Sequence, residues 1–252
     1  MCLVAVARDV HPRVALAIVA NRDEFHARPS EPAHWWREGW LAGRDLDAGG
    51  AWFGVRRDGR WALVTNVREP GGRDARKASR GEIVTRALAA PSVEDVLREL
   101  SADAERFNGY NLLAGEEPHA WWQSNRQPST FPMPRGVTAL SNAALGTPWP
   151  KVERLGAVVT DWARRSDPSI EPLFDALSDR TIAPDDRLPA TGVTREWERL
   201  LSAAFIVSGD YGTRCSTVLV VGRDGNARFV ERSFAPTGDL IGEVDERFAL
   251  DL

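Results

Sequence analysis

Cysteine is scarce in this sequence, which holds only Cys2 and Cys215 in 252 residues. Two cysteines are too few for the disulfide framework of a small secreted domain or for a cysteine-rich zinc site. Long apolar runs are also missing. A membrane-spanning helix needs about 18 consecutive apolar residues, and no stretch of the sequence is that long. The sequence therefore predicts a soluble protein of a reducing compartment, without a membrane span.

An excess of basic residues is missing as well. The 32 lysine and arginine residues are outnumbered by 36 aspartate and glutamate residues, which gives a formal net charge of −4. Nucleic-acid-binding domains usually carry a basic excess, so nucleic acid is not an expected partner. The apolar stretch from Cys2 to Ala7 is too short for a secretory signal, and no basic segment precedes it. We therefore expect a cytoplasmic protein.

The sequence does contain enough apolar material for a sizeable core. It is 43% hydrophobic and 27% charged, and no linker or internal repeat divides it, so we expect one domain over residues 1–252. Short runs rich in Val, Ile, Leu and Ala, separated by turn residues, predict three hairpins, and Asp58-Gly59 is a strong turn signal in the second. Their strands are expected at 3–8 with 13–21, 51–57 with 60–66, and 213–221 with 227–233.

Helices and further strands are expected between the hairpins. Ser79 with Glu82, and Ser92 with Asp95, are N-cap patterns in front of apolar faces. A polar loop is expected from residue 28 to 32, and the third hairpin is expected to end the chain. Segregated blocks of strands and helices predict an α+β fold with antiparallel sheets. The periodicity places two helices over about 79–101, others at 151–164, 172–177 and 195–205, and strands at 110–114, 119–123 and 137–141.

The start of the chain offers an unusual combination of groups. An initiator methionine before a small residue such as Cys2 is normally removed, which would leave a thiol and a free α-amine on one residue. The unperturbed pKa of an α-amine is about 8, so Cys2 could supply both nucleophile and base. Alternatively, Cys2 is a small apolar residue at the start of a strand. Position alone does not decide between these interpretations.

Polar side chains recur where apolar strands end. Asp23 follows one strand, and its carboxylate could hold an α-ammonium group or orient a thiol. Asn66 and Asn142 each close a strand with an amide that could donate to a developing oxyanion, and Arg214 stands near the start of another strand. Each residue is also explained as a turn former or an ion-pair partner. If the strands are neighbours, these side chains share one rim of the sheet.

Other conspicuous residues have weaker implications. The ten tryptophans could line a pocket for a flat or acyl ligand, although core packing is their commoner use. The four histidines show no metal-binding spacing, and the Gly49-Gly50 and Gly71-Gly72 pairs lack the strand-and-helix context of a phosphate loop. We therefore expect neither a metal site nor a phosphate loop.

Several further motifs accompany Asn21-Arg22-Asp23-Glu24. In this order and combination they resemble the NRDE family, which takes its name from that motif, and the resemblance spans almost the whole chain. The motifs are Met1-Cys2, Leu41-Ala42-Gly43-Arg44-Asp45, Gly49-Gly50, Trp52, Thr65-Asn66-Val67-Arg68, Ser79-Arg80-Gly81-Glu82, Asn108-Gly109-Tyr110-Asn111-Leu112-Leu113, Leu140-Ser141-Asn142, Pro148-Trp149-Pro150-Lys151 and Thr213-Arg214-Cys215-Ser216-Thr217.

The resemblance implies an N-terminal-nucleophile (Ntn) hydrolase fold, a four-layer αββα sandwich with two stacked antiparallel sheets between helix layers. It also implies a distant likeness to conjugated bile salt hydrolases and penicillin acylases. In that likeness Cys2 is the nucleophile, Asp23 the carboxylate near it, Asn142 the oxyanion-hole amide, Asn66 a further amide, and Arg214 the late-strand arginine beside the thiol.

The sequence departs from those hydrolases at one position. They carry an arginine three residues before the aspartate, where this chain has Ala20, and Arg22 stands directly before Asp23 instead. Substrate handling therefore does not carry over from them to this chain.

Functions from three classes stay open. The first is an amidohydrolase that cleaves a non-peptide C–N bond of a small molecule through a thioester on Cys2 and requires no cofactor. The second is a small-molecule binding or trafficking protein for haem or an acyl thioester, in which Cys2 or a histidine could be the axial ligand of haem. The third is a scaffold without a small ligand, in which Cys2, Asp23, Asn142 and Arg214 do not converge.

Overall fold

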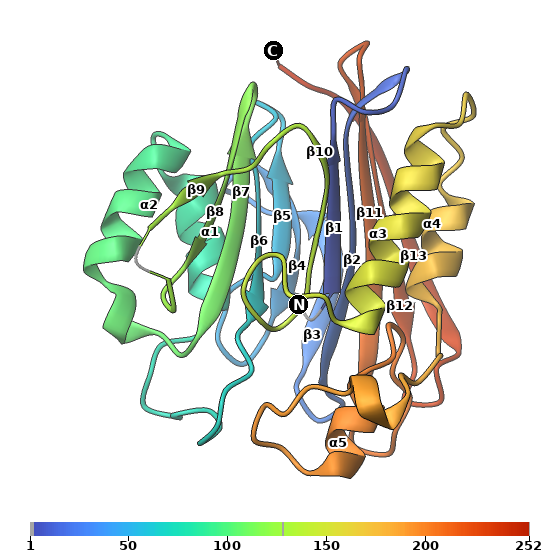
Figure 1. Ribbon diagram of the computed structural model, residues 1–252. Helices are drawn as coiled ribbons and strands as arrows, with labels where there is room; N and C mark the ends of the chain where they lie inside the picture. The colour runs from blue at the N-terminus through green and yellow to red at the C-terminus, as the bar shows by residue number, and fades with distance from the viewer. Residues whose placement is uncertain (1–2, 128, 252) are drawn as a thin grey trace.

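Two antiparallel sheets form the centre of the computed structural model, which describes residues 3–127 and 129–251 (Figure 1). Within these residues the first sheet has six strands: β10 (Gly136–Leu140), β1 (Leu3–Arg8), β2 (Val14–Phe25), β11 (Tyr211–Gly222), β12 (Asn226–Phe234) and β13 (Leu240–Ala249). The second has seven: β3 (Ser30–Trp35), β4 (Trp40–Asp45), β5 (Phe53–Arg56), β6 (Trp61–Asn66), β7 (Tyr110–Glu116), β8 (His119–Ser124) and β9 (Phe131–Pro132). In each sheet, strands that are neighbours in this order are hydrogen-bonded to each other.

Helices cover the outer face of each sheet (Figure 1). The helices α1 (Gly81–Ala89) and α2 (Val93–Ala102) pack on the second sheet, and α3 (Pro150–Ala163) and α4 (Glu171–Leu177) pack on the first. A third group, α5 (Arg195–Leu200) with the 3₁₀ turns Ala104–Arg106 and Asp185–Arg187, lies in the connections. The layers are therefore helix, sheet, sheet and helix, which confirms the predicted α+β fold and αββα order.

The three interfaces between these layers hold three separate hydrophobic cores. The core between the sheets includes Ile18, Leu63 and Phe229, whereas Val19 packs under α3 and α4, and Leu88 packs on the second sheet. Neighbours in β2 thus enter different cores because successive side chains of a strand point to opposite faces. A strand buried on both faces explains the continuous apolar run before the Asn21-Arg22-Asp23-Glu24 motif.

Four strands were not predicted: the edge strands β3, β9 and β13, and β4, which lies inside the second sheet between β3 and β5. The expected loop at residues 28–32 is wrong, because β3 begins at Ser30 and tolerates Pro32 at the edge of the second sheet. The expectation that the third hairpin ends the chain is also wrong, since β13 pairs with β12. Most residues of β13 are exposed, so its charged sequence lacks the apolar alternation that identifies a strand.

Helix boundaries differ from prediction at two ends. The residue that caps α1 is Arg80, and Ser79 only receives the Gly81 N–H at 3.3 Å, whereas Ser92 caps α2 as predicted by accepting the Asp95 N–H. The helix expected at 195–205 ends at Leu200. Beyond it, the Phe205 N–H donates to the Asp179 carbonyl and not to a carbonyl of this helix. None of the helices in the described ranges combines the length and hydropathy of a membrane span.

Gly50 allows the loop between β4 and β5 to approach α1. A Cβ added there would stand 2.4 Å from the Gly81 carbonyl carbon, and both groups belong to the backbone. We expect Gly50→Ala to lower the free energy of unfolding by about 1–3 kcal/mol in urea denaturation. Gly242→Ala is the control, because a Cβ there meets nothing within 4 Å. Equal stability of the two variants would contradict this packing.

Candidate active site

Two adjoining cavities open where β2, β6 and β10 end and β11 begins. The smaller, about 60 Å³, is lined by Arg22, Trp52 and the start of α1, and we call it the arginine cavity. The larger, about 490 Å³, is lined by Asn142, Asn108 and Tyr211, and we call it the amide cavity. Together they form the cleft. The lining residues that both cavities share are Asp23, Glu24, Arg28, Asn66, Arg73 and Arg80.

Three predicted site residues line the amide cavity. Asp23 comes from β2, Asn66 from the end of β6, and Asn142 follows β10. Cys2 lies outside the described residues. The first described residue, Leu3, pairs with Asn21 in β2, next to the cleft-lining part of that strand. The three residues come from both sheets, with Asp23 and Asn142 on the first and Asn66 on the second, so they line one cavity without sharing the rim of a single sheet.

The Asp23 carboxylate is buried and held by β11. Its Oδ1 accepts a hydrogen bond of 2.7 Å from the Thr213 hydroxyl, and Thr213 lies opposite Asp23 in the ladder between β2 and β11. The same hydroxyl accepts the Ile206 N–H at 2.9 Å. This chain of hydrogen bonds fixes the direction of the carboxylate before any ligand arrives.

Asn142 ties the two sheets together beside the cavity. Its Nδ2 donates to the Asn66 carbonyl at 3.0 Å, and its own carbonyl accepts the Arg68 N–H at 2.7 Å. One residue earlier, the Ser141 carbonyl accepts the Thr65 hydroxyl at 3.0 Å. A carboxamide carries two N–H groups, and within the described residues the Asn66 carbonyl takes one of them. The other is left to donate toward a ligand.

Arg214 lies apart from the cleft lining. Thr213 pairs with Asp23 and Cys215 with Arg22, so Arg214 is the extra residue of a β-bulge in β11. Its Nη1 donates to the carbonyls of Phe25, His26 and Arg28 at 3.1–3.2 Å, and burial lowers its pKa. A bulge redirects the side chain that it carries. Here it directs the guanidinium to the turn between β2 and β3.

Arg22 is the cleft residue that sequence reasoning missed. Its side chain is buried, 4% exposed, and its guanidinium lies 4.3 Å above the Trp52 ring. Arg22 and Ala20 are two positions apart and share the face of β2 that points between the sheets. Alternation with Ile18 and Ala20 could have placed Arg22 on that face, but not beside a cavity.

Two buried acidic groups lie behind the arginine cavity. Burial raises the pKa of Glu231, whose carboxylate receives the Ala33 N–H at 2.8 Å and the Thr217 hydroxyl at 3.2 Å. Burial also raises the pKa of the Cys215 thiol well above its usual value, and the charge of Glu231 raises it further. Cys215 is therefore a protonated thiol of the core, with little reactivity expected.

Other hollows and residues are less suited to the predicted chemistry. A larger cavity, about 840 Å³, lies at the hairpin turns near Pro12 and Asp224, and none of the described candidate residues lines it. Trp52 is the tryptophan that lines the cleft, and no described histidine does. Within the described residues, His, Cys, Asp and Glu side chains form no group that could hold a metal ion.

Comparison with known proteins establishes the family. A family model described as Transport and Golgi organisation 2 matches residues 1–236. The chain belongs to this family. The Transport and Golgi organization protein 2 homolog of Bos taurus is 32% identical over 260 residues, which cover 92% of this chain and 93% of that protein. The Homo sapiens homolog is 31% identical over 258 residues with the same coverage.

A solved structure confirms the Ntn-hydrolase-like fold. A variant of the conjugated bile acid hydrolase from Clostridium perfringens matches with a TM-score of 0.53 and 10% sequence identity. The match covers 100% of this chain and 99% of that chain. At this identity the likeness concerns the arrangement of the two sheets and their helices. The likeness assigns no role to any individual residue of this chain.

Proposed function

We propose that this protein is an N-terminal cysteine amidohydrolase that cleaves a non-peptide C–N bond of a small molecule through a thioester. The observation that carries the proposal is the gathering of Asp23, Asn66 and Asn142 on one cavity of about 490 Å³. A volume of this size is typical of small-molecule sites. The hydrolase-like fold supports the proposal, and so does the pairing of Leu3, the residue after Cys2, with β2 beside that cavity.

In the proposed reaction, the Cys2 thiolate attacks the carbonyl carbon of the amide. The α-amine of Cys2 takes the thiol proton and passes it to the leaving nitrogen, so that the C–N bond breaks and a thioester remains. The same amine then takes a proton from water, and the resulting hydroxide attacks the thioester. The carboxylic acid leaves and the thiol is restored.

Two groups of the cleft are assigned to charge stabilisation. The Asp23 carboxylate, oriented by Thr213, stabilises the α-ammonium group that forms when the α-amine takes the thiol proton. The remaining N–H of Asn142 donates to the oxyanion of the tetrahedral intermediate, and the Asn66 carbonyl fixes the direction of that amide. Arg214 is assigned a positioning role, since its guanidinium holds the turn that follows Asp23 and Glu24.

Release of amine from linear amides tests this function. A panel of N-acyl amides is incubated with protein whose Met1 is absent by mass, and free amine is measured with an amine-reactive dye. We expect at least one class of amide to release one or more moles of amine per mole of protein. No release from any amide, together with stoichiometric uptake of haem or an acyl thioester that Cys2→Ser leaves unchanged, would favour a carrier instead. A cytoplasmic location stays a prediction of the sequence.

A further inference from the structure

The arginine cavity holds a buried cation that the proposed reaction does not use. Arg22 is 4% exposed, and its Nη1 has no hydrogen-bond partner among the described residues. No carboxylate in the described ranges lies within 4 Å of its guanidinium. Burying an ionised group without a partner is costly. The stacking on Trp52 compensates for only part of this cost, since a cation–π contact is weaker than a buried ion pair.

The acidic groups around Arg22 are bound elsewhere. Asp45 accepts two hydrogen bonds from Arg28, at 2.9 and 2.7 Å, and also the Asp47 N–H. Glu24 accepts the Phe25 N–H and lies 4.0 Å from Arg28. Behind Arg22, burial raises the pKa of Glu231, which weakens it as a counter-charge. Four arginines line the arginine cavity against three carboxylates, those of Asp23, Glu24 and Asp45, so the cavity keeps an excess of positive charge.

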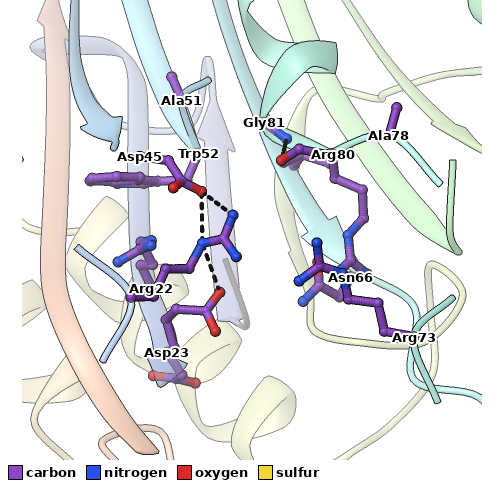
Figure 2. Close-up of a pocket in the computed structure, with 14 residues that line it drawn as sticks. Arg22, Asp23, Asp45, Ala51, Trp52, Asn66, Arg73, Ala78, Arg80 and Gly81 are labelled. Atoms are coloured by element: carbon purple, nitrogen blue, oxygen red, sulfur yellow. Dashed lines mark hydrogen bonds and ion pairs between the residues drawn. The ribbon is translucent and has the colours of Figure 1, made fainter. Parts of the chain in front are cut away.

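Further arginines reach the cavity from the second sheet's side. Figure 2 shows Arg22 and Asp23 on one side of the cavity, and Arg73 and Arg80 with Asn66 on the opposite side. Arg73 is exposed and has no ion pair among the described residues. Arg80 immediately precedes α1, a nine-residue helix whose N-terminus adds partial positive charge. Guanidinium groups thus converge on one small space from separate elements.

We propose that the arginine cavity binds an oxyanion, the carboxylate or phosphate of a ligand, between Arg22, Arg73 and Arg80. The cavity of about 60 Å³ has room for roughly four waters, which suits one compact polar group. Planar guanidinium forks match the geometry of both oxyanions. This inference rests on the proposed function in one respect: the rest of the ligand, an amide, occupies the adjoining amide cavity, so the substrate is an anionic amide.

Anion binding to the full-length protein tests this assignment. Inorganic phosphate and acetate are titrated separately at constant ionic strength against chloride, with melting temperature and calorimetric heat as readouts. We expect saturable binding of at least one anion. Binding of phosphate alone identifies a phosphoryl group, binding of acetate alone identifies a carboxylate, and binding of both identifies a general oxyanion site. Absence of saturable binding by either anion overturns the inference.

Variants locate the binding. Arg22→Gln should weaken anion affinity at least about tenfold, and Arg73→Ala about three- to tenfold. Arg37→Ala is the matched control, because Arg37 is exposed to solvent like Arg73 but does not line the cleft. If Arg22→Gln does not fold, the exposed Arg73 still provides the test. Affinity in Arg73→Ala and Arg22→Gln equal to wild type would refute the site.

The outcome is separable from that of amide hydrolysis. Anion binding that depends on Arg22, without any turnover of amides, would refute the proposed reaction and leave the anion site intact. Hydrolysis of neutral amides as fast as anionic ones, unchanged in Arg22→Gln and Arg73→Ala, would refute the anion site and leave the reaction intact.

Discussion

Replacing Cys2 by alanine should lower the rate of amide release by a factor on the order of 10³ or more. The reason is that the thioester cannot form without the thiol, so the covalent route is lost entirely. The measurement is amine release at saturating substrate by wild type and Cys2→Ala. Cys215→Ala is the matched control, because the Cys215 thiol is buried and burial raises its pKa.

Cys215→Ala should keep the turnover of wild type, apart from a loss of stability from the small space left in the core. Turnover that survives in Cys2→Ala and disappears in Cys215→Ala would assign the chemistry to Cys215 instead of Cys2. Turnover that survives in both variants would exclude a cysteine nucleophile.

Replacing Asn142 by alanine should lower kcat by about 10²–10³, with a much smaller change in KM. One N–H of the Asn142 amide donates to the Asn66 carbonyl. In the proposed reaction the other donates to the oxyanion, which forms only when the thiolate attacks the substrate carbonyl. An interaction made only in the transition state affects kcat and not ground-state binding. Single-substrate kinetics at saturating and limiting concentrations separate the two constants.

Thr65→Val controls for a merely structural role of this segment. The Thr65 hydroxyl donates to the Ser141 carbonyl next to Asn142, and its loss disturbs the link between the sheets without removing the amide. We expect Thr65→Val to lower the melting temperature while kcat stays within a fewfold of wild type. Equal losses of kcat in Thr65→Val and Asn142→Ala would show that Asn142 acts through packing alone.

The apolar runs of the central strands made the fold predictable. β1, β2, β11 and β12 lie within a few residues of their predicted ranges, because each is buried and its apolar run is bounded by turn residues. β4 and β9 were not predicted, and β3 and β13 escaped prediction because edge strands need less apolar surface. β3 carries Pro32, and the residues of β13 are largely exposed. Their pairing depends on a neighbouring strand far away in the sequence.

The site was predictable where it depends on strand ends and unpredictable where it depends on tertiary detail. Asp23, Asn66 and Asn142 line one cavity because their strands, which belong to both sheets, end beside it. Arg214 points elsewhere because a one-residue bulge in β11 redirects it. The place of Arg22 follows from strand alternation, but two tertiary details do not: its Nη1 has no hydrogen-bond partner among the described residues, and the nearby Asp45 pairs with Arg28. No local pattern encodes either detail.

The central claim is that Cys2 is an activated N-terminal nucleophile, and intact mass after brief treatment with a thiol-directed electrophile at neutral pH tests it most directly. The account predicts that Met1 is absent and that one adduct forms rapidly on wild type and not on Cys2→Ala, since buried Cys215 stays unmodified. Retention of Met1, or a Cys2 thiol that reacts no faster than Cys215, would contradict it.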